Sequence, residues 1–193
     1  MSVAALVVKI GGSLAASPLL GAWLTAIATA RGRLVVVPGG GPFADAVRAV
    51  QPVLGFDDTT AHAMALLAMA QYGIFLASHR DAVLTPAETL QAVAATLAAG
   101  GMPVWLPPHT LGAADGVAAS WDMTSDSLAL WLASRLGAPA LLLVKSKSEG
   151  TDLLDGAFAG LRPGYAGRVF LAGPAHLPRG SIDPRHPPGV LLP

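Results

Sequence analysis

The sequence contains no cysteine, which excludes disulfide bonds and thiolate metal sites. It also has little charge: only 12% of its residues are charged, and twelve basic residues are balanced by twelve acidic ones. They form no basic stripe that could bind nucleic acid or an anionic membrane. The N-terminus lacks the basic start and the uninterrupted apolar core of a secretory signal. We therefore expect a cytoplasmic protein whose partners are small molecules, not nucleic acids or membranes.

The composition is mainly apolar. Apolar residues make up 53% of the 193 residues, which is typical of a single domain with a sheet covered on both faces. Short apolar runs predict strands at residues 6–10, 103–106, 140–144, 168–171 and 190–192, and at the start of LVVVPGGG (34–41). Helices are predicted over 19–30, from about 42, from 59 or 60 to about 72 with Gly73 as its end, over 86–99, and from the N-cap Thr124 or Ser125 to 137. This alternation predicts one α/β domain over residues 1–193, a three-layer α/β/α sandwich with a mainly parallel central sheet.

Two glycine runs directly follow predicted strands. Residues 9–13 are KIGGS and residues 37–41 are VPGGG. Because a parallel sheet binds its ligands where the strands end at their carboxyl edge, both runs are expected at one edge. Glycines let backbone N–H groups converge on an anion, and Lys9, one of only three lysines, adds a cation. Each motif alone is an ordinary turn, but together they predict two loops that hold phosphate groups.

A dinucleotide site is an alternative interpretation. The Walker A pattern is absent, whereas GGGPFA (39–44) fits the loose Gly-x-Gly-x-x-Gly/Ala pattern after a strand. Asp57 or Asp58 lies near the place, about 20 residues on, where an acidic ribose ligand would be expected. An NAD(P)-binding oxidoreductase is therefore an alternative. It leaves KIGGS and the segment 120–137 without a role.

Four segments, in order and with suitable spacing, resemble the amino acid kinase superfamily, which includes acetylglutamate, aspartate, carbamate and uridylate kinases. They are KIGGS (9–13), VPGGG (37–41), TSDSLALWLA (124–133) and LLLVKSKSEG (141–150). In the last segment, Glu149 stands where the Lys-x-Asp-Gly pattern of uridylate kinases has aspartate. The resemblance implies the α/β/α fold and transfer of the γ-phosphoryl group of ATP, with Mg²⁺, to a small acceptor. SWDMTSDSLALWLA and AHAMALLAMAQYG are most similar to the branch with the kinase of methanofuran biosynthesis. That similarity implies conversion of (5-(aminomethyl)furan-3-yl)methyl phosphate to its diphosphate.

The resemblance also implies roles for single residues. Lys9 contacts the transferring phosphoryl group, Asp126 orients the active-site lysines, and Lys145 takes part in catalysis. The residues expected at ATP are Gly11, Gly12, Ser13, Thr124, Lys145 and Lys147, and the acceptor loop consists of Gly39, Gly40 and Gly41. Residues up to about 115 form the acceptor half and those from about 116 the nucleotide half. No residue is assigned as a direct metal ligand.

Other residues near these segments keep two interpretations. Asp45 and Arg48 either line the acceptor pocket or form a solvated pair at helical spacing. His62 either contacts the acceptor or is a hydrogen-bonded core histidine. Trp121 and Trp131 are expected to pack in the core.

The chain departs from the superfamily pattern near its end. Many members carry a second catalytic lysine late in the chain, but here no lysine follows Lys147. Either Lys145 or Lys147 replaces it, or catalysis is weakened. A non-catalytic nucleotide- or phosphometabolite-binding protein on the same fold is therefore a further alternative. The apolar helix predicted from residue 59 or 60 to 72 also favours a homodimer.

Overall fold

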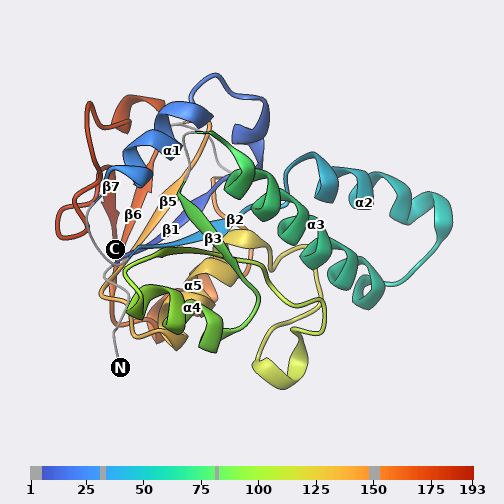
Figure 1. The fold of residues 1–193 in the computed structure, drawn as a ribbon. Helices are drawn as coiled ribbons and strands as arrows, with labels where there is room; N and C mark the ends of the chain where they lie inside the picture. Colours follow the sequence, from blue (N-terminus) through green and yellow to red (C-terminus); the bar gives the residue numbers. More distant parts are fainter. Residues whose placement is uncertain (1–5, 31–33, 81–82, 148–152) are drawn as a thin grey trace.

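A seven-stranded sheet forms the centre of the molecule (Figure 1). The computed structural model describes residues 6–30, 34–80, 83–147 and 153–193. The strands are β1 (Leu6–Ile10), β2 (Leu34–Pro38), β3 (Leu84–Ala87), β4 (Met102–Trp105), β5 (Ala140–Val144), β6 (Arg168–Ala172) and β7 (Val190–Leu192). Their order is β3-β4-β2-β1-β5-β6-β7, and all neighbours are parallel except β6 and β7. The predicted mainly parallel sheet is confirmed.

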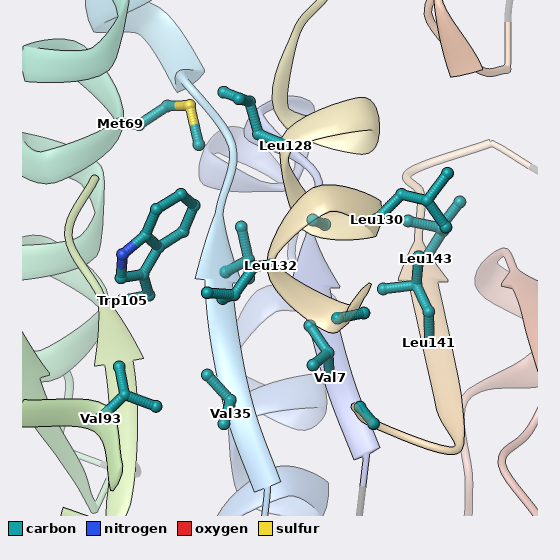
Figure 2. Packing of buried hydrophobic residues seen from close by; sticks show 14 of the residues in the cluster. Val7, Val35, Met69, Val93, Trp105, Leu128, Leu130, Leu132, Leu141 and Leu143 are labelled. Atoms are coloured by element: carbon teal, nitrogen blue, oxygen red, sulfur yellow. The ribbon is translucent and has the colours of Figure 1, made fainter. Parts of the chain in front are cut away.

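Helices cover both faces of this sheet. The described helices are α1 (Leu20–Ala28), α2 (Gly41–Leu54), α3 (Asp58–Ser78), α4 (Leu90–Ala98), α5 (Ser125–Arg135) and α6 (Phe158–Leu161), with short 3-10 helices η1 (Gly12–Ala16), η2 (Ala113–Asp115), η3 (Arg162–Gly164) and η4 (Pro174–His176). Of these, α1 covers one face and α4 and α5 cover the other. One apolar cluster lies between α1 and the sheet, and a second lies between the sheet and α4 and α5. Figure 2 shows side chains of α5, such as Leu128 and Leu132, packed over the strands. The predicted three-layer α/β/α sandwich is confirmed.

Strand β1 distributes its side chains between these two clusters. Successive residues of a strand point to opposite faces of the sheet. Val8 and Ile10 belong to the cluster on the α1 face, whereas Val7 belongs to the cluster on the α5 face. Lys9 alternates with Val8 and Ile10 and so shares the α5 face with Val7, where it is only 3% exposed. A buried ammonium group is costly unless it is paired, so a partner for Lys9 is expected on the α5 side.

Two element boundaries differ from the predictions by more than two residues. Helix α3 does not end at Gly73 but continues to Ser78. A Cβ at Gly73 would lie 2.4 Å from Cδ2 of Leu106, so this glycine allows the helix to approach the sheet closely. The helix predicted over 86–99 is also wrong in its first part, because Pro86 lies in edge strand β3, where the missing N–H is tolerated. Helix α4 begins only after Thr89, whose side chain accepts a hydrogen bond from the N–H of Ala92.

Helices α2 and α3 lie side by side and extend away from the rest of the molecule (Figure 1). By length and composition α3 could cross a membrane. However, Leu66, Met69, Tyr72 and Leu76 are buried in the two apolar clusters. We therefore interpret α3 as a core helix of the fold.

Candidate active site

The carboxyl ends of three strands meet at one edge of the sheet. Strand β1 is central, and the register pairs Ile10 with Pro38 of β2 on one side and with Val144 of β5 on the other. The segments that follow these strands are therefore neighbours although they are far apart in the sequence. They carry the KIGGS loop, the triple glycine and Lys145.

The two glycine loops are in backbone contact. A Cβ at Gly12 would lie 2.3 Å from the backbone nitrogen of Gly41, and a Cβ at Gly39 would lie 2.3 Å from that of Gly12. No side chain fits at these positions, so the glycines are required by this close approach. The N–H of Gly39 donates to Ile10 at 2.8 Å, and the N–H of Gly11 donates to Val144 at 2.9 Å. The predicted juxtaposition of the two loops is present in the structure.

Beside these loops, Asp126 is held between two lysines. It lies in the first turn of α5, where the helix dipole favours a negative charge. Nζ of Lys145 donates to one carboxylate oxygen at 2.6 Å, and Nζ of Lys9 lies 2.9 Å from the other. The Lys9 contact is an ion pair without good hydrogen-bond alignment. Asp126 is thus the partner that buried Lys9 requires.

The electrostatics of this trio follow from burial and from mutual charge. Burial acts to raise the pKa of Asp126, but the charges of Lys9 and Lys145 outweigh it and keep that pKa below its usual value. Burial, together with the charge of Lys9, lowers the pKa of Lys145 to about 8, although Asp126 opposes the shift. With all three groups ionised, the trio carries one net positive charge. Such a centre favours negative charge that develops on a transferred group.

A cavity of about 220 Å³ opens next to the glycine loops. Its lining combines residues from both loops, α2, α3 and the start of α5: Gly12, Ser13, Gly40, Gly41, Ala44, Asp45, Arg48, Asp58, Ala61, His62, Ala65, Leu66, Met69, Ser120, Trp121, Met123, Thr124, Ser125 and Leu128. The residues predicted for the acceptor lie here except Gly39, and Gly12, Ser13 and Thr124, which are predicted for ATP, border the same cavity. The cavity is therefore the candidate acceptor pocket.

Asp45 and Arg48 line this cavity and also pair with each other. Nη1 of Arg48 lies 3.4 Å from Oδ1 of Asp45 in an exposed pair. His62 likewise lines the pocket while its Nε2 bonds the carbonyl oxygen of Leu111 at 3.0 Å. That bond fixes the imidazole ring between α3 and the loop that follows β4.

The prediction that Trp121 packs in the core is wrong. It is only partly buried and lines the pocket. Its Nε1–H donates to Oε1 of Gln51 at 2.6 Å, and the guanidinium of Arg48 lies 4.3 Å from the centre of its ring. Two residues of α2 therefore determine its position, which sequence periodicity cannot reveal. Trp131 is also partly buried, but it packs against the buried cluster on the α5 face and is stacked on Trp105.

Among the residues predicted for ATP, Ser13 contacts a residue that the sequence did not point to. Its hydroxyl lies 2.7 Å from the hydroxyl of Ser146, directly after Lys145. Lys147 is exposed. Glu149 lies outside the described residues. Lys145, not Lys147, is thus the lysine that the structure brings to Asp126.

A second residue that sequence reasoning missed is Asp155. Its carboxylate accepts hydrogen bonds from Thr124 and Ser127 at the start of α5. In the sequence it stands in a segment rich in glycine and proline, where an Asp-Gly pair indicates no more than a turn. Asp58 lines the pocket, whereas the sequence pattern associates it only with a ribose ligand.

The donor set is compatible with Mg²⁺ that arrives with ATP. Within the described ranges, no three His, Asp or Glu side chains cluster as a metal site. Both oxygens of Asp126 contact lysines. Mg²⁺ commonly keeps several waters and binds through substrate phosphates. An ion carried mainly by ATP phosphate oxygens would therefore not need a further carboxylate cage.

Comparison with known proteins identifies the family and the fold. Residues 4–149 match the amino acid kinase family. The chain is 30% identical over 157 residues to the [5-(aminomethyl)furan-3-yl]methyl phosphate kinase of Methanocaldococcus jannaschii, covering 77% of this chain and 72% of that protein. The uridylate kinase of Archaeoglobus fulgidus has the same fold, with a TM-score of 0.66 and 14% identity over the full length of both chains. The aspartate kinase of Synechocystis gives a TM-score of 0.58 at 15% identity, covering 97% of this chain and 42% of that one. The chain therefore belongs to the amino acid kinase family of small-molecule phosphotransferases.

Proposed function

We propose that the protein transfers the γ-phosphoryl group of ATP to the phosphate of (5-(aminomethyl)furan-3-yl)methyl phosphate, giving ADP and the corresponding diphosphate. The observation that carries this proposal is the contact of buried Lys9 and Asp126 with the partly buried Lys145, beside two glycine loops and a small pocket. The 30% identical relative, which its name describes as a kinase of this phosphate, supports the acceptor. The expected location is the cytoplasm.

Phosphoryl transfer requires that the protein position the reactants and stabilise the negative charge of the transition state. An oxygen of the acceptor phosphate attacks the γ-phosphorus of ATP, a new P–O bond forms, and the bond to the β,γ-bridging oxygen breaks. A phosphate monoester has a second pKa of about 6, so near neutral pH it attacks without a general base. This agrees with Asp126, whose two oxygens contact lysines and whose pKa is lowered. Mg²⁺ bound to the ATP phosphates would neutralise part of their charge.

Each member of the trio has a distinct proposed role. Lys9 and Lys145 place positive charge where negative charge develops on the transferred group and on the leaving oxygen. Asp126 keeps the two ammonium groups close together despite their mutual repulsion. Lys145 takes the place of the late lysine that this chain lacks. Backbone N–H groups of Gly12 and Ser13 are suited to the ATP phosphates.

The pocket offers charges of both signs to the acceptor. Arg48 suits a phosphate, and the carboxylates of Asp45 and Asp58 suit an ammonium group. The aminomethyl and phosphate groups in the relative's name carry those two charges. The cavity volume of about 220 Å³ lies below the roughly 300–1,000 Å³ of pockets for drug-sized ligands, which favours a small acceptor.

Phosphorus NMR of the purified protein tests the proposal. With Mg²⁺, ATP and the furan phosphate, we expect ADP signals and two new coupled signals of a diphosphate. The matched control is the analogue with a methyl group in place of the aminomethyl group, which should react much more slowly. Binding of ATP without turnover of any phosphorylated alcohol in a panel would instead favour a non-catalytic binding protein. Binding of a nicotinamide dinucleotide without ATP binding would favour the oxidoreductase alternative.

The lowered pKa of Lys145 predicts how activity depends on pH. Lys145 loses its positive charge as pH rises through about 8, so kcat/KM for ATP should fall above that pH. In Lys145→Arg the guanidinium stays charged, and the alkaline limb should move upward by about two pH units or more. Steady-state rates between pH 6 and 10 measure this. An unchanged limb in the arginine variant would show that another group titrates.

We also propose that a second copy of the chain covers the outer surface of α2 and α3. Leu67, Ile74 and Phe75 of α3 are 47%, 55% and 41% exposed, and Val53 and Leu54 at the end of α2 are 79% and 70% exposed. Apolar side chains gathered on one projecting helix pair are typical of an interface.

Analytical ultracentrifugation tests this interface. Wild type should sediment as a dimer and Ile74→Glu as a folded monomer. The control is Val190→Glu, which places the same charge on an exposed residue of β7 and should remain a dimer. A monomeric wild type at micromolar concentration would refute the proposal.

A further inference from the structure

Asp155 binds the start of α5 through four hydrogen bonds. Its Oδ2 accepts from the N–H and the hydroxyl of Thr124, both at 2.9 Å, and from the N–H of Ser127 at 3.0 Å. Its Oδ1 accepts a short hydrogen bond from the hydroxyl of Ser127. The residues that follow Asp155 also contact the segment before α5, because the N–H of Ala157 donates to the carbonyl oxygen of Asp122 at 2.8 Å. A segment that follows β5 is therefore fastened to the segment that begins α5.

These bonds replace the cap that α5 lacks. Thr124 occupies the N-cap position, but its side chain makes no capping bond within the helix. In most helices the N-cap side chain accepts from the N–H two or three positions further on. Here that N–H belongs to Ser127, and the acceptor is the carboxylate of Asp155. Its negative charge also lies at the positive end of the helix dipole.

The residues that Asp155 binds lie on either side of Asp126. Thr124 precedes Asp126 by two positions and Ser127 follows it directly, so both ends of this turn are fixed. Asp126 must keep one oxygen 2.6 Å from Nζ of Lys145 and the other 2.9 Å from Nζ of Lys9. A displacement of the turn by about 1 Å would disturb both contacts, and a misplacement of that size can cost about 10²-fold in rate.

We propose that Asp155 is a positioning residue that holds the first turn of α5, and with it Asp126, between the two lysines. Its kinetic consequence rests on the proposed function, but its effect on the lysines does not. The charged groups in contact with Asp126 are Lys9 on β1 and Lys145 after β5. If Asp126 moves away, Lys145 loses the carboxylate that favours its charged form.

Selective lysine labelling provides a readout that needs no substrate. The chain has only three lysines, so ¹³Cε-lysine protein gives three NMR signals, which Lys145→Arg helps to assign. In Asp155→Ala the titration of Lys145 should move to lower pH, and kcat should fall about 10²-fold, with KM for ATP changed by less than about threefold. Asp155→Asn keeps an oxygen that accepts from the two N–H groups and should retain most of the activity. Asp183→Ala, which removes a carboxylate from a distant turn, should change neither quantity.

Three outcomes test the positioning role of Asp155. A Lys145 titration at the wild-type pH in folded Asp155→Ala, with unchanged kcat, would reduce Asp155 to a helix cap and overturn the proposal. If Asp155→Ala does not fold, Ser127→Ala removes one of the four bonds and should move the Lys145 titration in the same direction; no movement there overturns the proposal. If wild type does not phosphorylate the furan phosphate, the proposed acceptor fails, and the NMR titration still decides the role of Asp155.

Discussion

Replacing Lys9 by Met should lower kcat by at least about 10³-fold while ATP binding is largely retained. The reason is that Lys9 is buried on the α5 face, and methionine keeps the apolar stem of the side chain but removes the charge. An interaction that strengthens as charge moves onto the transferred group lowers the barrier more than it aids ground-state binding. Asp126 still contacts Lys145 in this variant, so the fold should persist. Lys9→Ala should lose activity similarly.

ADP release at saturating ATP and acceptor measures the effect, and calorimetry measures ATP affinity. The control is Arg179→Met, which removes an exposed cation from the C-terminal segment and should behave as wild type. Turnover by Lys9→Met within about tenfold of wild type would contradict a catalytic role for Lys9. If Lys9→Met lost both ATP binding and turnover, Lys9 would instead be assigned to ground-state binding.

Replacing Asp126 by Asn should abolish most activity and also destabilise the protein. The variant leaves buried Lys9 and partly buried Lys145 facing a neutral amide, and breaking a buried ion pair costs about 3 kcal/mol of the free energy of unfolding. Without Asp126, the pKa of Lys145 should fall further below about 8. Between the folded-state pKa of Lys145 and its ordinary pKa of 10.5, the unfolded chain holds a proton on Lys145 that the folded chain has lost, so the free energy of unfolding increases with pH. This range is wider in the variant than in wild type, because the folded-state pKa is lower. The loss relative to wild type should therefore be larger at pH 6 than at pH 9.

Urea unfolding at the two pH values measures this difference. Asp45→Asn serves as the control because the side chain of Asp45 is 76% exposed, so its unfolding midpoint should not change. An Asp126→Asn protein that is equally stable but inactive would show that the trio contributes to catalysis and not to folding. An active variant would contradict the proposed role of Asp126.

The elements of the fold could be predicted from the sequence because their signals are local. An apolar run followed by glycines, as in residues 6–13 and 34–41, predicts a strand and a tight turn wherever it occurs. Predictions were wrong where the same residue type occurs in two different structural settings. Gly73 was expected to end a helix, but the close approach of Leu106 explains it. Pro86 was expected in a helix, but an edge strand tolerates it.

By itself, therefore, the sequence determined the α/β alternation, the glycine loops and the family, and it pointed to Lys9 and Asp126. Only the tertiary structure decided that Lys145 is the lysine that contacts Asp126, that Trp121 lines a pocket, and that Asp155 caps α5. The physical reason is that strand and helix periodicity depends on neighbours in the chain. Contacts between distant side chains depend on the order and register of the strands, which no local pattern encodes.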